Sequence, residues 1–496
     1  LISGLKACAT IGALDKGRTL HLRLIKLGYD GDLFVSNTLV VMYAKCGCML
    51  ESIYIFSKLD IGTLMTWNAL MTGYVQCGYG GKTLQCFEQM RDEGISPNSV
   101  TFLCVLKACG ITGSSRLGEE IHKEVKGCGL LAGDITVGTA LVDMYAKCGL
   151  LGKAKEAFDE LPERNAITWN ALITGYAQHG LGEEALECFK KMREGGLTPT
   201  AITFICLLKA CASVRSSDMG EEIHAEIRKQ GLLPKYNSLG TALVDMYAKC
   251  GMLGKAREVF KELPRCNVIS WNALISGYSQ QGLGDEALDV FEQMKHEGFL
   301  PNVVTYICVL DACSTIGCLM LGEEIHQEVQ KQGLLHKDIT LGNALVDMYA
   351  KCGLVERSQE VFDELQGQDV VSWNALLDGY AQVGDGRKVL ELFNKLVTAG
   401  IDPDLVTFLI VLHACNHAGL IEEGEIMFND MNCIYCLIPM SKHYACFVDL
   451  FSRAGYFSKA ISSIEKVPST SRLQVYWTLL AACRKWMNVE LGRWAF

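Results

Sequence analysis

The stretch TWNALITGYAQHG at residues 168–180 decides the fold, because it recurs along the chain at a fixed interval. Its tryptophan returns every 102 residues, at Trp67, Trp169, Trp271 and Trp373. Two further phrases keep that spacing: MYAKCG, with Cys46, Cys148, Cys250 and Cys352, and GEEIH, with His122, His224 and His326. A fixed period of this kind indicates an array of similar units. Function is therefore analysed repeat by repeat.

The composition suits a helical array. The chain has 496 residues, of which 49% are hydrophobic, and a repeat protein grows by adding units to one continuous core. It contains only 9 prolines, and its 49 glycines recur at fixed places, which is typical of helices separated by glycine turns. No membrane-spanning segment is apparent. The sequence begins at Leu1, without Met and inside a repeat, so we expect a fragment, and the absence of a visible signal or transit peptide carries little weight.

The 23 cysteines favour free thiols over disulfides. Disulfide scaffolds are short and rich in loops, whereas most cysteines here lie where a small apolar residue would pack, as in KCG and KAC. The prediction is a reducing compartment. Cys433 and Cys436 form a single C-x-x-C pair, and the repeated histidines are far apart along an array. We therefore predict no metal site and no cofactor.

One period divides into three related parts: 166–200, 201–236 and 237–267, with 35, 36 and 31 residues. Each part has the pattern of two helices. In the first, NALITGYAQHG predicts one helix that ends at Gly180, and GEEALECFKKMREGG predicts a second. Ala185, Leu186, Phe189 and Met192 fall at helical spacing on one face of the second helix. Stacked helix pairs of this length predict an α-solenoid.

The repeated phrases resemble the pentatricopeptide repeat family. They are VxSWNALIxGYxQxGxxxEALxxFxxMxxxGxxPN, VTFxxVLxACxxxGxxxxGxxIHxxxxxxG and LGxALVDMYAKCGxxxxAxxVFxELxxxN. The alternation of 35, 36 and 31 residues resembles the land-plant PLS class. The resemblance implies an all-α, right-handed α-solenoid of stacked two-helix pentatricopeptide repeats.

The resemblance also implies repeat boundaries. A partial L-type repeat is expected at 1–32, tandem S, P and L repeats at 33–404, and variant L and S repeats at 405–472. Within the tandem part the S repeats begin at 33, 135, 237 and 339, the P repeats at 64, 166, 268 and 370, and the L repeats at 99, 201 and 303. Residues 473–496 resemble the start of the C-terminal E motif, truncated at Phe496.

Proteins of this family bind single-stranded RNA in organelles, one base per repeat, and PLS-class members mostly specify C-to-U editing sites. The resemblance therefore implies an organellar RNA-binding protein, in a mitochondrion or a chloroplast, with deaminase or editing-factor proteins as partners and no membrane partner. The complete zinc deaminase signature, H-x-E followed by P-C-x-x-C, is absent from the sequence: H-x-E recurs at His122, His224 and His326, but no P-C-x-x-C follows. We predict that the chain is not an enzyme, and that catalysis belongs to a missing C-terminal domain or to a partner.

In the family, the fifth and last residues of a repeat select the base. The P-type fifth residues are Asn68, Asn170, Asn272 and Asn374, and the corresponding last residues are Asn98, Thr200, Asn302 and Asp404. The S-type fifth residues are Asn37, Thr139, Thr241 and Asn343, and the last residues are Thr63, Asn165, Asn267 and Asp369. The L-type fifth residues are apolar and are left unread: Leu103, Ile205, Ile307 and Leu409.

Hydrogen-bonding capacity gives this selection a physical basis. A carboxylate only accepts, and so suits the ring N–H of uracil or guanine, whereas an amide can donate to the ring acceptor of cytosine or adenine. Fifth-position Asn goes with pyrimidines and Thr with purines in the family. The predicted RNA is 5′-YCnAYnACnUUnn-3′, in which the pairs ending in Thr63 and Thr200 are read only as pyrimidine. The alternative for the asparagines is a helix-start role, since Asn is a favoured N-cap.

Two further sets of residues are candidates for RNA contact. The second residues of the P repeats are apolar, and in the family such side chains sandwich bases: Met65, Ile167, Ile269 and Val371. The alternative is ordinary core. Lysines at position thirteen of the S repeats share a helix face with position two and are predicted to bind phosphate: Lys45, Lys147, Lys249 and Lys351. Their alternative role is a solvated helix end.

The net charge of −10 argues against tight, salt-driven binding of nucleic acid. It favours modest affinity carried largely by base contacts. Two other functions stay open. A protein-binding helical scaffold would suit the acidic composition, although it leaves the Asn/Thr and Asn/Asp pairing unexplained. A member of this family can also act in organellar RNA splicing or stability.

Overall fold

The computed structural model describes residues 1–29, 31–59, 62–335, 337–465, 467, 472–485 and 493. Every regular element in these residues is a helix, and none of them forms a strand. The chain divides into two compact units, which are treated separately. Unit 1 comprises Leu1–Met252 and Lys261–Pro264, and unit 2 comprises Leu253–Phe260 and Arg265–Phe496.

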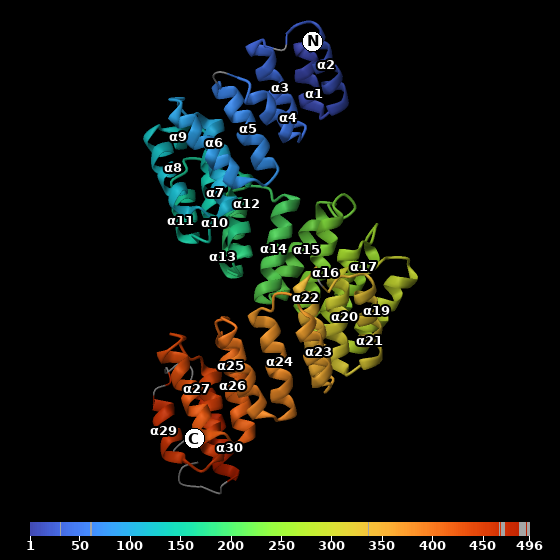
Figure 1. The fold of residues 1–496 in the computed structure, drawn as a ribbon, viewed down its shortest axis with the longest axis vertical. Coiled ribbons are helices and arrows are strands. Elements are labelled where there is room, and N and C mark those ends of the chain that lie inside the picture. Colours follow the sequence, from blue (N-terminus) through green and yellow to red (C-terminus); the bar gives the residue numbers. More distant parts are fainter. Residues whose placement is uncertain are drawn as a thin grey trace. The chain divides into compact units, whose positions relative to one another are not determined.

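Unit 1 is a series of helix pairs (Figure 1). Its helices are α1 (Ile2–Ile11), α2 (Leu14–Lys26), α3 (Leu33–Lys45), α4 (Met49–Phe56), α5 (Leu64–Gln76), α6 (Gly80–Asp92), α7 (Ser99–Thr112), α8 (Ser115–Gly127), the single turn α9 (Leu130–Gly133), α10 (Ile135–Lys147), α11 (Leu151–Asp159), α12 (Ala166–Gln178), α13 (Gly182–Glu194), α14 (Ala201–Val214), α15 (Ser217–Lys229) and α16 (Asn237–Lys249).

Unit 2 continues the same pattern. Helix α17 (Leu253–Glu262) starts in unit 2 and ends in unit 1. The others are α18 (Val268–Gln280), α19 (Gly284–His296), α20 (Val303–Ile316), α21 (Leu319–Lys331), α22 (Ile339–Lys351), α23 (Val355–Glu364), α24 (Val370–Val383), α25 (Gly386–Thr398), α26 (Leu405–Ala418), α27 (Ile421–Cys433), α28 (Ser441–Arg453), α29 (Phe457–Glu465) and α30 (Arg472–Lys485).

The first helices of successive pairs lie side by side in both units. In unit 1, α3, α5, α7, α10, α12, α14 and α16 each contact the next, and in unit 2 the same holds for α18, α20, α22, α24, α26, α28 and α30. Most second helices contact their own first helix and the first helix of the following pair, as α6 contacts α5 and α7. This two-layer stacking is an α-solenoid, and it confirms the predicted fold class.

Helix starts coincide with the repeat boundaries expected from the sequence. The helices that begin at residues 64, 99, 135 and 166 each begin at the first residue of a predicted P, L or S repeat, and the pattern holds through 441. Helix α12 ends at Gln178, and Gly180 follows with φ 76°, a left-handed conformation that glycine adopts without steric cost. The E-motif prediction is described only at 473–485 and 493; residues 486–492 and 494–496 lie outside the described residues.

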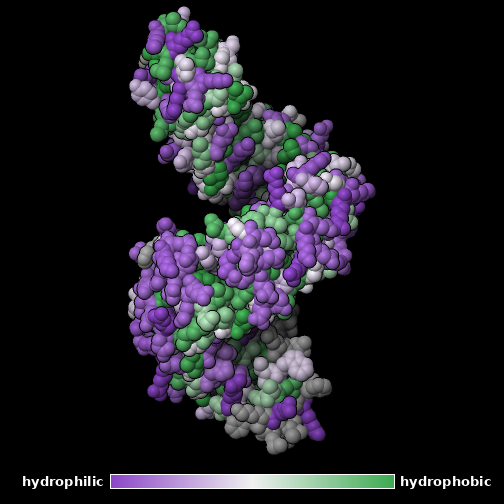
Figure 2. All heavy atoms as spheres, turned by 90° about the vertical axis from the view of Figure 1, so that its right-hand side faces the viewer, coloured by the Kyte–Doolittle hydropathy of each residue, from purple (hydrophilic) through white to green (hydrophobic). Residues whose placement is uncertain are grey.

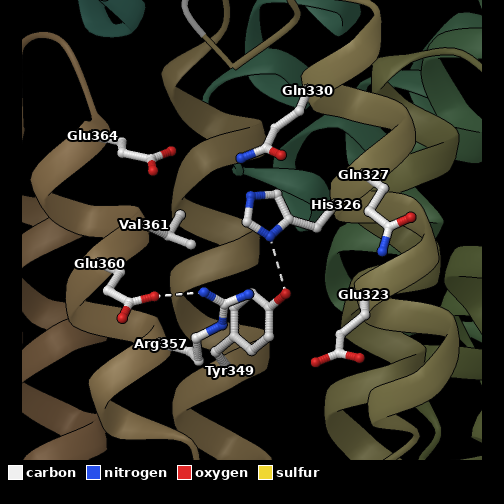
Figure 3. Close-up of a pocket in the computed structure, with 9 residues that line it drawn as sticks. All are labelled: Glu323, His326, Gln327, Gln330, Tyr349, Arg357, Glu360, Val361 and Glu364. Carbon is white, nitrogen blue, oxygen red and sulfur yellow. Dashed lines mark hydrogen bonds and ion pairs between the residues drawn. The ribbon is translucent and has the colours of Figure 1, made fainter.

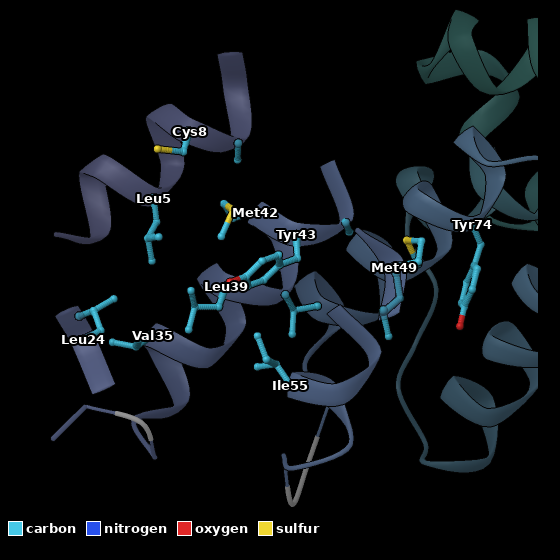
Figure 4. Close-up of a cluster of buried hydrophobic side chains, with 14 residues drawn as sticks. Leu5, Cys8, Leu24, Val35, Leu39, Met42, Tyr43, Met49, Ile55 and Tyr74 are labelled. Atoms are coloured by element: carbon cyan, nitrogen blue, oxygen red, sulfur yellow. The ribbon is translucent and has the colours of Figure 1, made fainter. Parts of the chain in front are cut away.

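The tryptophan of each WNAL phrase belongs to the core. It packs edge-to-face against a phenylalanine of the preceding second helix, with ring centroids 4.5 to 4.7 Å apart in the pairs Phe56–Trp67, Phe158–Trp169, Phe260–Trp271 and Phe362–Trp373. Such pairs stabilise a core beyond the area that they bury. The most conspicuous residue of the period therefore holds one repeat against the next. A similar layer of buried side chains, including Leu39 and Met42, fills the start of unit 1 (Figure 4).

All cysteines are free thiols in the structure. The buried cysteines at position eleven of the L-type repeats pack in the core, and burial raises the pKa of Cys109, Cys211, Cys313 and Cys415 to about 12. Cys433 and Cys436 are exposed. Within the described residues there is no group of three or more metal-binding side chains, and none of the described helices combines the length and apolar character of a membrane span.

Candidate nucleic-acid interface

The structure brings the fifth and last residues of every P repeat into direct hydrogen bonds, although they lie 30 residues apart in the sequence. The fifth-position Nδ2 donates to a side-chain oxygen of the last residue at 3.0 to 3.1 Å in the pairs Asn68–Asn98, Asn170–Thr200, Asn272–Asn302 and Asn374–Asp404. The S repeat that begins at residue 339 forms the same bond, from Asn343 to Asp369, at 3.1 Å.

The other S-type pairs differ. Thr139 meets Asn165 through an intermediate, because the Thr168 hydroxyl lies 2.9 Å from the Thr139 hydroxyl and 3.0 Å from Asn165 Oδ1. Among the described residues, Asn37 makes no hydrogen bond to Thr63, and the Asn37 Oδ1 is buried without a partner. Thr241 and Asn267 belong to different units, and each is described only within its own unit.

The helix-start role belongs to the last residues of the repeats. The fifth-position asparagines are not N-caps, since each lies one turn inside a helix. The capping side chains, which accept a backbone N–H of the first turn, are Thr63, Asn98, Asn165, Thr200, Asn267, Asn302, Asp369 and Asp404. The N-cap alternative is thus wrong for position five. The side-chain amide at position five lies beside the last residue of its repeat, and that last residue is the N-cap of the first helix of the next repeat.

The cap fixes the orientation of both amides. Asn98 Oδ1 accepts the backbone N–H of Thr101 at 3.0 Å, and an N–H can only donate, so the oxygen of Asn98 must face the helix. Asn68 then meets that oxygen with its Nδ2 and accepts the Thr101 hydroxyl on its Oδ1 at 2.7 Å. The Nδ2 of exposed Asn98 makes no hydrogen bond to the described residues and is left as a donor.

When the last residue is aspartate, the atom that remains without a hydrogen bond is an oxygen instead of a nitrogen. Asp404 Oδ1 accepts from the Thr407 N–H, the Thr407 hydroxyl and Asn374 Nδ2, so that Oδ2 is the remaining atom, an acceptor. Burial favours the neutral form of Asp404, yet these hydrogen bonds outweigh burial and its pKa lies below the ordinary value. The carboxylate therefore stays ionised at neutral pH.

The hydroxyl at position three of the following repeat completes the network and was missed in the sequence. Thr101, Thr203, Thr305 and Thr407 each donate to the fifth-position Oδ1 of the preceding repeat, at 2.5 to 2.8 Å. All four hydroxyl residues are fully buried. The repeated Thr in VTF, ITF and VTY was the available signal, but in the sequence it is indistinguishable from a small core residue.

The second residues of the P repeats are exposed, so the ordinary-core alternative is wrong. Met65, Ile167, Ile269 and Val371 are between 55% and 69% exposed, and the second residues of the L repeats are exposed as well. Each P-type amide pair joins two neighbouring helices whose second residues are both exposed and apolar, as Met65 in α5 and Val100 in α7. We call these exposed second residues of the P and L repeats the apolar ladder; they lie on the same helices as the amide pairs.

The predicted phosphate-binding lysines are mostly engaged within the protein. Lys147, Lys249 and Lys351 form ion pairs of 2.7 to 3.0 Å with aspartates one turn earlier on the same helix, Asp143, Asp245 and Asp347. Each pair cancels most of the lysine charge as seen by a distant anion. Lys45 has Val41 at the aspartate position and forms no ion pair with the described residues.

The repeated histidines pack as expected. His122, His224 and His326 each hydrogen-bond a tyrosine of the next first helix through Nδ1, at 2.9 to 3.0 Å. Figure 3 shows His326 with Tyr349, at the wall of a small cavity of about 180 Å³ that Glu323, Glu360 and Glu364 also line. Burial lowers the pKa of His122 and His326, so both imidazoles are neutral at pH 7.

Acidic side chains lie largely on the second helices, where many are paired. Lys126–Glu160, Lys153–Glu119 and Arg228–Glu262 join successive second helices at 2.5 to 2.9 Å. Figure 2 shows hydrophilic residues over much of one face of the molecule, with smaller hydrophobic patches between them. Part of the net negative charge is thus placed away from the amide pairs of the first helices.

Family descriptions match the chain at the positions of these helix pairs. The PPR repeat family matches residues 63–110, 164–213, 266–315 and 368–417. A second description, PPR repeat, matches 139–165, 241–268, 343–370 and 406–436.

Relatives from Arabidopsis thaliana align over almost the whole chain. A putative pentatricopeptide repeat-containing protein is 35% identical and covers 99% of this chain and 72% of its own length. A chloroplastic relative is 36% identical, with 98% and 56% covered, and a mitochondrial one is 38% identical, with 97% and 47% covered. The chain therefore spans about half to three quarters of the length of these relatives.

A solved structure has the same fold. The pentatricopeptide repeat protein PPR10 from maize aligns with a TM-score of 0.51 at 20% identity, over 99% of this chain and 82% of PPR10. This likeness agrees with the α-solenoid seen in each unit.

Proposed function

Since the chain belongs to the PPR repeat family, we propose that it binds single-stranded RNA and reads one base with each P or S repeat. The observation that carries this proposal is the recurring amide network of positions five and last. In five repeats the fifth-position asparagine donates to the last residue at 3.0 to 3.1 Å, and the repeats differ in whether that last residue is Asn, Thr or Asp.

The free atom supports the base assignment. Asn98 and Asn302 keep an amide donor, which suits the ring acceptor of cytosine, whereas Asp369 and Asp404 keep a carboxylate acceptor, which suits the ring N–H of uracil. With Thr139–Asn165 and Thr241–Asn267 assigned to adenine, and Asn37–Thr63 and Asn170–Thr200 to a pyrimidine, the proposed RNA is 5′-YCnAYnACnUUnn-3′.

The exposed apolar ladder supplies the contacts that do not depend on sequence. A base hydrogen-bonded to Asn68 and Asn98 would lie between Met65 and Val100, and every base has an apolar face that such side chains can cover. In three of the four S repeats the second residue is polar, at Thr136, Ser238 and Thr340, so that these sites hold their bases less tightly; the first S repeat has Phe34 there.

The organelle and the biological role are proposed from relatives. Some curated relatives are named chloroplastic or mitochondrial, and we assign this chain to one of these organelles. The PLS-type alternation of repeat lengths favours specification of a C-to-U editing site, with catalysis supplied outside this chain. A role in RNA splicing or stability would use the same RNA-binding residues.

A gel mobility shift tests the proposal directly. The wild-type chain is titrated with an RNA that matches the proposed string and with a control in which A and C are exchanged at the four firmly assigned A and C positions. Each lost base contact costs about 1–3 kcal/mol, so the matched RNA should bind at least tenfold more tightly. Equal binding of both RNAs refutes the base assignment. Absence of RNA binding by the folded chain favours the protein-scaffold alternative.

A further inference from the structure

The first helices of unit 1 carry a second row of charged residues beside the amide pairs. Position nine lies one helical turn after position five and therefore on the same face. In the L repeats this position holds Lys107 in α7 and Lys209 in α14, both fully on the exposed side of their helices. In unit 2 the equivalent residues are Asp311 in α20 and His413 in α26.

Neither lysine is neutralised by its surroundings. Among the described residues Lys107 and Lys209 form no ion pair. On the preceding helices, position nine holds the neutral residues Thr72 and Thr174. On the following helices it holds Asp143 and Asp245, but each aspartate is already bound by its own lysine, Lys147 or Lys249.

The paired and unpaired lysines share one face. The Lys147 side chain crosses Gly110 of α7, where a Cβ atom would lie 3.2 Å from Lys147 Cδ. Gly110 is one turn beyond Lys107 on the same helix, so the two lysines are near neighbours that differ in having or lacking a counterion. For Lys147 and Lys249 this contrast reverses the order expected from the sequence, in which the S-repeat lysines were the phosphate contacts. Lys45 forms no ion pair with the described residues and keeps its predicted role.

The two units differ in charge on this face. Over positions nine and thirteen of all first helices, unit 1 has six lysines against two aspartates, a net +4: Lys6, Lys45, Lys107, Lys147, Lys209 and Lys249 against Asp143 and Asp245. Unit 2 has three cations against four aspartates, a net −1: Lys351, Arg453 and Arg484 against Asp311, Asp347, Asp378 and Asp449.

We propose that the unpaired lysines Lys107 and Lys209 bind RNA phosphates beside Lys45, and that unit 2 holds RNA through bases with little phosphate neutralisation. The inference rests on the proposed RNA-binding function. An unpaired ammonium beside an apolar ladder can take a backbone phosphate without first breaking an ion pair. A lysine bound to aspartate must lose that partner or share it.

Salt dependence tests the inference. Binding of the matched RNA is measured by fluorescence anisotropy over a range of salt for the wild type, for Lys107→Gln/Lys209→Gln and for the control Asp143→Asn/Lys147→Gln, which removes a neutral pair. Each phosphate contact on a single strand contributes about −0.7 to the slope of log K against log [salt]. The lysine variant should lose about 1.4 from that slope, a weakening of about 25-fold at about 0.1 M salt. The control should keep the wild-type slope.

A second variant, expected to strengthen phosphate binding, distinguishes a lost contact from misfolding, because a misfolded protein would not gain salt dependence. Asp311→Lys places in unit 2 the residue that the L repeats of unit 1 carry and should steepen the slope by about 0.7. Retention of the wild-type slope by the lysine variant, or its loss in the control, overturns the inference. Failure of the base assignment is seen separately, as equal binding of matched and exchanged RNA by the wild type. A folded chain that binds neither RNA overturns both proposals.

Discussion

Replacing Asn98 by aspartate should change the preferred base of one repeat from cytosine to uracil. In the structure Asn98 Oδ1 caps α7 and accepts from Asn68, and its Nδ2 is the free atom. Aspartate is as good an N-cap as asparagine, so its Oδ1 would keep both roles. Only the free atom changes, from a donor to an acceptor.

The magnitude follows from the bond that is exchanged. One well-placed hydrogen bond to a base edge discriminates by about 1–3 kcal/mol, which corresponds to about 5- to 150-fold in affinity. The wild type should prefer C at the second nucleotide of the proposed RNA by a ratio in this range, and Asn98→Asp should prefer U. The assay is competition between two RNAs that differ only at this nucleotide.

The matched control is Asp134→Asn. Asp134 also caps a first helix, α10, by accepting the Thr136 N–H, but its repeat has apolar Leu103 at position five. This change should leave the preference at every nucleotide unaltered. The reasoning is refuted if Asn98→Asp weakens C and U RNAs equally while the protein stays folded, because the last residue would then act only as a cap.

Four further outcomes are expected. Trp169→Ala should destabilise the chain by about 3–5 kcal/mol, because a large buried aromatic is removed from its packing against Phe158; chemical denaturation followed by circular dichroism measures this. Met65→Ala should weaken RNA binding several-fold without changing the melting temperature, because Met65 is exposed. Exposed Cys433 should react with iodoacetamide in the native protein while Cys109, whose pKa burial raises to about 12, stays unmodified in mass spectra. Burial lowers the pKa of His326, so its contribution to stability should be present above the ordinary histidine value of about 6.5 and be lost as pH falls below it; His326→Gln should flatten the decline in melting temperature between neutral and acidic pH.

The fold was predictable because it depends on local and periodic information. Helix propensity, glycine turns and the spacing of apolar residues all repeat every 102 residues, and they predicted the helix pairs. The exact starts were not predicted from them, since NALITGYAQHG placed the first helix from Asn170 whereas α12 begins at Ala166. The Phe–Trp contact between repeats was not predicted. It joins residues 11 apart across a helix boundary, and a recurring aromatic pair at that spacing does not by itself indicate contact.

The candidate site was predictable in its residues but not in its chemistry. Positions five and last were identified through the family resemblance, whereas the capping role of the last residue and the closing hydroxyl of Thr101 appear only when the next repeat is placed beside the first. The ion pair of Asp143 with Lys147 was accessible from the sequence, since an aspartate four residues before a lysine on a helix is a familiar pair. It lowers the expected contribution of Lys147 to phosphate binding.

Selection from a random RNA pool tests the central claim most directly. The folded wild-type chain is incubated with RNAs that carry a randomised central segment, and bound molecules are amplified and sequenced. The account predicts enrichment of YCnAYnACnUU in one orientation, with the fixed C, A and U positions separated as the repeats are. Enrichment of a motif unrelated to this spacing, or no enrichment from a pool that the protein binds, would contradict base reading by the amide pairs.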